Sequence, residues 1–142
     1  MSTPYILLSD GLFLLWTESI AMKIRIKGDS VRFRLTQSEV QTLSESGEIY
    51  DSTNFGTTKF NYGVVLKSDI EQLHINFENS SIILFMPEAN GRSWFSNDII
   101  TFDHTLKTTA GNNLYLLLEK DFTCLDNTIE DQSDNYPNPK LS

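Results

Sequence analysis

The stretch that decides the fold is Met22-Lys-Ile-Arg-Ile-Lys-Gly-Asp-Ser-Val-Arg-Phe-Arg-Leu35, in which apolar and polar residues alternate. A period of two is typical of half-buried strands, and Gly28-Asp29 between two such runs predicts a hairpin turn. Thr36-Gln37-Ser38-Glu39 follows directly and has the spacing of a capping box, which predicts the start of a helix. Gly47 predicts the end of that helix. The basic unit is therefore a hairpin followed by a short helix.

The same pattern returns 51 residues later, so that residues 22–49 align with residues 73–100. Apolar positions coincide along the alignment, as in Ile24 with Ile75, Phe33 with Leu84, and Leu43 with Trp94. Asn79-Ser80 takes the place of the first hairpin turn, and Pro87-Glu88 marks the start of a second, shorter helix. We interpret this similarity as an internal duplication.

Two further strands are predicted after each helix, at residues 48–53 and 59–66 and at residues 99–104 and 114–119. The chain then consists of two ββαββ units, about residues 22–67 and 73–119, in one domain that spans residues 22–121. The fold class is α+β and β-rich. We expect the eight strands to form either a continuous antiparallel sheet or a barrel, and favour the barrel because closure removes exposed strand edges.

The two ends of the chain are set apart from this domain. Residues 1–21 carry no Lys or Arg and no apolar run of roughly 20 residues, so they fit neither a secretory signal nor a membrane span. They are either an extra strand pair or the product of an over-extended reading frame ahead of Met22. Residues 122–142 form an acidic tail, which we expect to pack on the domain.

Composition argues against several classes of function. The net charge of -8 argues against binding to nucleic acid or to an anionic membrane, because these partners attract positive surfaces. Cys124 is the one cysteine, so no internal disulfide forms and a reducing compartment, the cytoplasm, is expected. Phosphate-binding loops, dinucleotide fingerprints and serine elbows are absent from the sequence, and no cofactor is predicted.

The hairpin turn at Gly28-Asp29 fixes a register that places positive side chains together on one face. These side chains are Lys23, Arg25, Lys27, Arg32 and Arg34. Like charges opposite each other destabilise a hairpin by up to about 1 kcal/mol per pair, so something should offset them. One hypothesis is an anion site, centred on Lys23, Arg25, Arg32 and Arg34, for a phosphate, a carboxylate or an acidic partner.

The alternative hypothesis is that the protein's own acids neutralise this face. The candidate acids lie in and just before the tail: Glu119, Asp121, Asp126, Glu130, Asp131 and Asp134. In that case the tail packs across the basic face.

The tail also suggests a metal or thiol site. The candidate residues are Cys124, His104, Asp126, Glu130 and Asp131, whose thiolate, imidazole and carboxylates are metal ligands. A metal-dependent or thiol enzyme is the alternative function. Because few acids and histidines converge on the expected core, we instead predict a non-catalytic binding or accessory protein that contacts an anionic ligand or partner through the basic hairpin face.

Four segments resemble a small bacterial family of proteins of unknown function. They are Met22-Lys-Ile-Arg-Ile-Lys-Gly-Asp-Ser, Leu35-Thr36-Gln37-Ser38-Glu39-Val40, Glu119-Lys120-Asp121-Phe122 and the run from Glu130 to Pro139. The resemblance extends from Met22 to Pro139. It implies no activity, cofactor or catalytic residue, but it implies that the acidic, proline-ended tail belongs to the domain.

Overall fold

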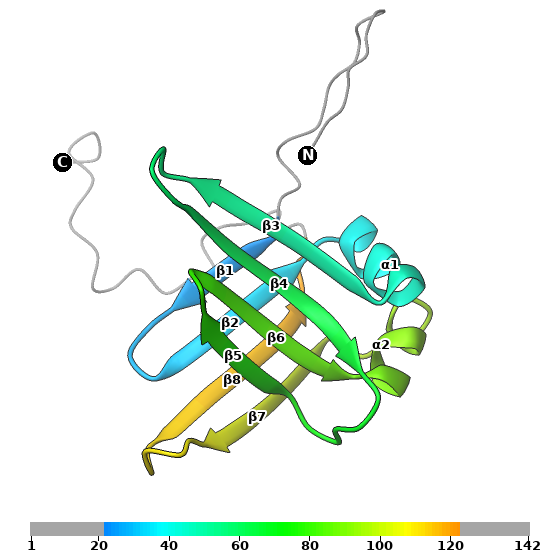
Figure 1. Ribbon diagram of the computed structural model, residues 1–142. Helices are drawn as coiled ribbons and strands as arrows, with labels where there is room; N and C mark the ends of the chain where they lie inside the picture. Colours follow the sequence, from blue (N-terminus) through cyan, green and yellow to red (C-terminus); the bar gives the residue numbers. More distant parts are fainter. Residues whose placement is uncertain (1–21, 123–142) are drawn as a thin grey trace, which may run out of the picture.

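The computed structural model describes residues 22–122, which form eight strands and two helices (Figure 1). The strands are β1 (Lys23–Ile26), β2 (Ser30–Leu35), β3 (Glu48–Asn54), β4 (Lys59–Lys67), β5 (His74–Glu78), β6 (Ser81–Pro87), β7 (Thr101–Lys107) and β8 (Asn113–Lys120). The helices are α1 (Gln37–Ser46) and α2 (Glu88–Trp94). Within residues 22–122 each predicted strand and helix is present, and the boundaries differ by at most three residues. The strand pair considered for residues 1–21 lies outside the described residues.

The first hairpin has the register that its turn predicts. Lys23 pairs with Arg34 and Arg25 pairs with Arg32. Lys27 and Ser30 exchange backbone hydrogen bonds of 3.1 Å across the turn, where Gly28 has a φ of 55°. The prediction of a two-residue turn is therefore confirmed.

Helix α1 begins and ends where its capping signals place it. The Thr36 hydroxyl accepts a hydrogen bond from the Glu39 N–H, and the Glu39 carboxylate accepts one of 2.8 Å from the Thr36 N–H. At the other end Gly47 has a φ of 87°, and its N–H donates to the Leu43 carbonyl at 2.9 Å. These contacts satisfy backbone groups that the helix leaves unpaired at its ends.

The strands form two separate four-stranded sheets, so the expected single antiparallel sheet or barrel is wrong. Sheet A has the order β1-β2-β8-β7, and sheet B has the order β3-β4-β6-β5. In each sheet the central pair, β2 with β8 or β4 with β6, is parallel. The physical reason is that the first hairpin of each half pairs with the last two strands of the other half, which leaves two open mixed sheets (Figure 1).

Matching hydrogen bonds support the duplication of the ββαββ unit. In sheet A the Tyr115 N–H donates to the Asp29 carbonyl at 2.9 Å, and in sheet B the Asn61 N–H donates to the Ser80 carbonyl at the same distance. Asp29 and Ser80 are separated by the 51 residues of the sequence repeat. The two halves are therefore equivalent: each contributes its first hairpin to one sheet and its last two strands to the other.

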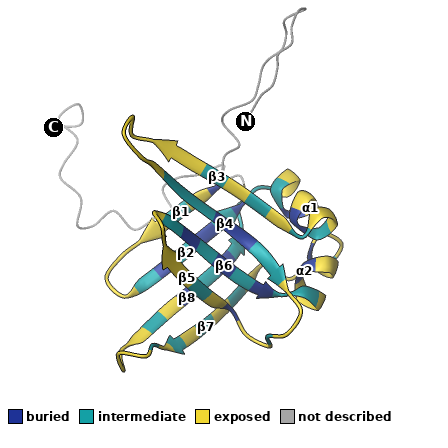
Figure 2. Cartoon of the chain, in the orientation of Figure 1, coloured by how far each residue is buried: buried dark blue, intermediate teal, exposed yellow. Residues whose placement is uncertain are grey.

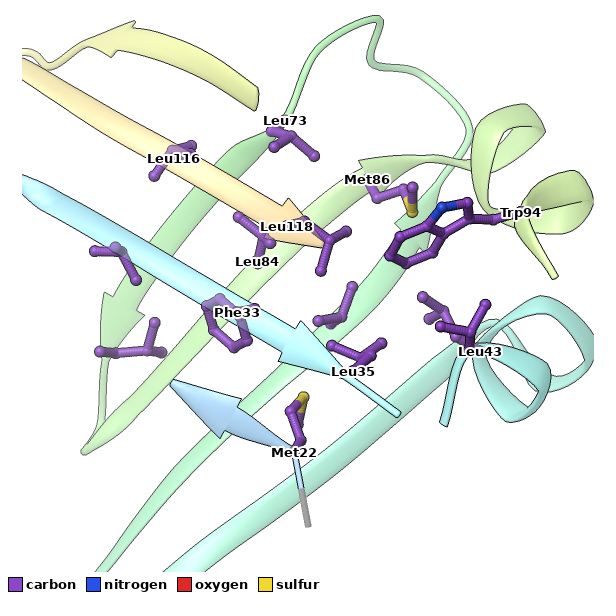
Figure 3. Close-up of a cluster of buried hydrophobic side chains, with 14 residues drawn as sticks. Met22, Phe33, Leu35, Leu43, Leu73, Leu84, Met86, Trp94, Leu116 and Leu118 are labelled. Carbon is purple, nitrogen blue, oxygen red and sulfur yellow. The ribbon is translucent and has the colours of Figure 1, made fainter. Parts of the chain in front are cut away.

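The core lies between the two sheets and is closed at one end by the helices (Figure 3). Alternate residues of the central strands are buried at their inward positions: Val31, Phe33, Leu35, Val64, Ile82, Leu84, Met86, Leu116 and Leu118. Leu43 of α1 and Trp94 of α2, equivalent residues of the repeat, are both fully buried. Figure 2 shows that the edge strands β3 and β5 are largely exposed, as their burial patterns indicate.

Replacing Glu39, whose side chain is half-buried, with glutamine is expected to stabilise the protein at pH 7 by about 0.5 kcal/mol. Burial raises the pKa of Glu39, while its hydrogen bonds with Thr36 lower it and the charges of Asp51 and Asp121 raise it further. A carboxyl whose pKa is raised by folding stabilises the folded state while it is protonated, and this stability is lost as the pH rises through that pKa.

Glutamine keeps the capping hydrogen bond without the charge. Urea denaturation at several pH values measures the effect. The advantage of the variant should be present at pH 7 and should disappear below the pKa of an ordinary glutamate. If the two proteins differed in free energy of unfolding by the same amount at all pH values, this explanation would be contradicted.

Candidate functional site

The four predicted site cations lie together on the outer face of sheet A. Their strands pair with Lys23 opposite Arg34 and Arg25 opposite Arg32, and cross-strand partners point to the same side of a sheet. Ile24 and Phe33, which alternate with these cations along β1 and β2, point to the other side, where they pack in the core. We call the side chains of Lys23, Arg25, Lys27, Arg32 and Arg34 the basic face.

Two acids of the same chain neutralise part of the basic face. Glu119 lies beside Arg34 on β8, and one of its carboxylate oxygens accepts a hydrogen bond of 2.8 Å from Arg34 Nε. Asp121 follows the end of β8, and its carboxylate lies 3.0 Å from Lys23 Nζ. Both acids are well shielded from solvent, with side chains 14% and 16% exposed.

Arg32 shares Glu119 with Arg34. Its Nε lies 2.9 Å from the same Glu119 oxygen. The direction of the N–H does not suit a hydrogen bond, so this buried nitrogen has no hydrogen-bond partner among residues 22–122. The contact is therefore an ion pair only, and one carboxylate serves two guanidinium groups.

A shallow pocket of about 190 Å³ opens on the remaining part of the basic face. Its lining includes the charged and polar residues Arg25, Lys27, Ser30 and Arg32, together with Val31, Tyr115 and Leu117. Within the described part of the chain, neither Arg25 nor Lys27 forms an ion pair. We call this hollow the face pocket.

Tyr115 borders the face pocket, and its hydroxyl donates a hydrogen bond of 2.9 Å to Asp103 Oδ2 on β7. This hydrogen bond is the main reason why the pKa of Tyr115 lies above its usual value, with a smaller effect of burial. The hydroxyl is therefore protonated at neutral pH and engaged with Asp103. The donors that remain in the pocket come from the cations and Ser30.

The equivalent face of sheet B shows that the fold does not need these charges. The five cation positions are occupied there by His74, Asn76, Glu78, Ile83 and Phe85. The positions of Glu119 and Asp121 are occupied by Val65 and Lys67. Both sheets have the same topology, so the basic face is a property of sheet A that its strand order does not require.

Sequence reasoning missed the half of the face pocket that comes from β8. Tyr115 and Leu117 alternate with the buried Leu116 and Leu118, so the outward direction of their side chains could be inferred from the period of two. Their position beside β2 could not, because it depends on a parallel pairing over more than 80 residues.

The residues of the predicted metal site are mostly beyond the described range. Cys124, Asp126, Glu130 and Asp131 lie outside residues 22–122, so their part of the prediction stays untested. His104 is half-buried in the middle of β7 rather than at a strand end, on the same side of the strand as Phe102 and Leu106. Between Met22 and Phe122 no three His, Cys, Asp or Glu side chains are grouped so that they could hold a metal ion.

The fold and face define a β-rich α+β protein built from two interleaved ββαββ halves, with a cationic surface on one of its two sheets. The chain belongs to a family of unknown function (DUF7009), whose family model matches residues 22–140. No curated protein and no solved structure matches it significantly. Over residues 22–122, neither helix has the length and hydropathy that crossing a membrane requires.

Proposed function

We propose that this protein is a non-catalytic binding or accessory protein that holds an anionic ligand or an acidic partner on the basic face of sheet A. The observation that carries the proposal is the face pocket, where Arg25 and Lys27 have no acidic partner within residues 22–122 and Arg32 shares one. Of the five cations, three form ion pairs with two acids, Glu119 and Asp121, and the other two form none among residues 22–122. An excess of positive charge beside a hollow favours an anion.

The energetic argument comes from the contrast between the two sheets. Opposed like charges, such as Arg25 with Arg32, destabilise a strand pair by up to about 1 kcal/mol. The equivalent pair in sheet B is Asn76 with Ile83, which carries no such repulsion. An anion between the two guanidinium groups would offset the repulsion in sheet A and would be bound by charge-assisted hydrogen bonds.

The single cysteine supports a reducing compartment, and the cytoplasm is part of this proposal. Four of the five candidate residues of the alternative, a metal-dependent or thiol enzyme, lie in the tail, and the fifth, His104, lies on β7. That alternative stays a prediction. Replacing Cys124 with alanine distinguishes it from anion binding on the basic face. An enzyme of this kind loses metal binding or thiol reactivity, whereas anion binding on the basic face is unchanged.

Replacing Arg25 with glutamine is expected to weaken the binding of inorganic pyrophosphate about tenfold, which corresponds to about 1.4 kcal/mol. The variant removes one guanidinium from the face pocket and also removes its repulsion with Arg32, so the protein should not lose stability. Chemical-shift titration by NMR at low ionic strength measures both the affinity and the residues that respond. The shifts should concentrate on β1, β2 and β8.

The matched control is Lys59→Gln. Lys59 is an exposed cation on β4 of sheet B, with no ion pair to another described residue, so the change in net charge is the same. It should leave pyrophosphate binding unaltered. The proposal would be contradicted if both variants weakened pyrophosphate binding equally. It would also be contradicted if pyrophosphate caused no saturable chemical-shift change in the unchanged protein.

A further inference from the structure

Asp121, near the end of the described residues, is bonded to β2 and to a cation of the basic face. The Asp121 N–H donates to the Leu35 carbonyl at 2.8 Å, which extends the β2–β8 pairing beyond the end of β8. The Asp121 carboxylate is paired with Lys23. The chain therefore enters residues 123–142 from the rim of the basic face, beside the positive charge.

The charges of the segment that follows are complementary to those of the face pocket. Residues 123–142 contain four acids and one cation: Asp126, Glu130, Asp131, Asp134 and Lys140. Their net charge is therefore -3. The pocket is lined by three cations, of which Arg25 and Lys27 lack an acidic partner among residues 22–122. The family model also extends through residue 140, so it includes this acidic segment.

The segment is long enough to reach the pocket. Tyr115 precedes Asp121 by six residues on β8, which corresponds to about 20 Å along the strand. Glu130 and Asp131 follow Asp121 by nine and ten residues, which span up to about 30 Å when extended. After the chain reverses direction, these two carboxylates come within reach of the pocket.

We infer that the acidic segment 123–142 docks its carboxylates in the face pocket and competes there with an external anion. This inference rests on the proposed function, since it assigns a regulator to the same site. The tie at Asp121 keeps the segment at a high effective concentration, and such tethering strengthens weak contacts. An external anion binds when it displaces the tail, and this exchange is sensitive to salt because it is electrostatic.

The first test detects docking without any added ligand. A nitroxide label is placed between the tail acids by Ser133→Cys in a Cys124→Ala background. It should broaden the backbone NMR signals of Arg32 and Tyr115 more than those of Ile83 and Phe85 on sheet B. Neutralising the tail by Asp126→Asn, Glu130→Gln, Asp131→Asn and Asp134→Asn should remove this difference, as should high salt. Equal broadening of both faces would overturn the inference.

The second test measures competition. The full-length chain with the neutralised tail should bind inorganic pyrophosphate about fivefold more tightly than the unchanged protein, and Arg25→Gln should cancel this gain. Unchanged affinity in the neutralised chain would overturn the inference but leave the proposed function standing. If the label shows that the tail docks but neither chain binds pyrophosphate, the tail contact stands. Competition with an external anion, and with it the proposed function, is then contradicted.

Discussion

Replacing Trp94 with alanine is expected to lower the free energy of unfolding by about 4 kcal/mol, within the range for large-to-small changes at buried aromatic residues. Trp94 is fully buried where α2 closes the space between the sheets. Its ring meets Phe102 edge-on at 5.2 Å between centroids, and its Nε1–H donates to the Ile99 carbonyl at 2.7 Å. Alanine leaves a cavity and removes both contacts.

Urea denaturation followed by circular dichroism measures this loss. For a domain of this size the expected decrease in the midpoint of thermal unfolding is roughly 15 °C or more. Trp94→Phe is the control, because phenylalanine keeps a ring in the core but lacks the indole N–H. Its loss should be about half as large. A loss of less than about 1 kcal/mol for Trp94→Ala would contradict the central role of this side chain in the core.

Replacing Glu119 with glutamine is expected to destabilise the protein by about 2 kcal/mol. One carboxylate serves both Arg32 and Arg34, so the variant leaves two neighbouring guanidinium groups without a counter-charge. Removal of one partner from a fully buried pair destabilises by about 3–5 kcal/mol. The expected value is smaller here because the Arg34 side chain is 39% exposed and water screens part of the charge.

Asp121→Asn is the matched control in the same denaturation experiment. Its partner Lys23 is 63% exposed, and such surface pairs contribute at most about 1 kcal/mol. The loss should therefore be clearly smaller than for Glu119→Gln. Equal losses would show that Glu119 has no special role between the two arginines.

A triple variant that introduces three uncharged residues from the equivalent face of sheet B separates stability from binding. Arg32→Ile, Arg34→Phe and Glu119→Val introduce the residues found at the equivalent positions, Ile83, Phe85 and Val65. Apolar residues often replace a partly buried ion-pair group without loss of stability. The triple variant should therefore stay within about 1 kcal/mol of the unchanged protein while pyrophosphate binding falls. A severe loss of stability would mean that the charges serve folding.

The local structure of each half could be predicted because its signals lie close together in the sequence. The Gly28-Asp29 turn sets the register that puts Arg25 opposite Arg32, and the capping box from Thr36 to Glu39 begins α1. Both features involve contacts between residues a few positions apart. The basic face followed from them directly.

The arrangement of the strands into sheets could not be predicted in the same way. A parallel pair such as β2 with β8 has no turn to mark it, and the alternation of β8 is equally compatible with other neighbours. The sharing of Glu119 by two arginines and the apolar lining of the face pocket by Leu117 depend on this pairing. Only the part of the candidate site on β1 and β2 could therefore be predicted from the sequence.

The exchange of hairpins between the halves also affects how the chain folds. Sheet B uses strands from one continuous stretch between Glu48 and Pro87, whereas sheet A joins the two ends of the domain, with Ser30 beside Tyr115. Contacts between distant residues form slowly because a long loop must close first. During synthesis from the N-terminus, sheet A must wait for β8, so the basic face is completed only when nearly the whole domain has left the ribosome.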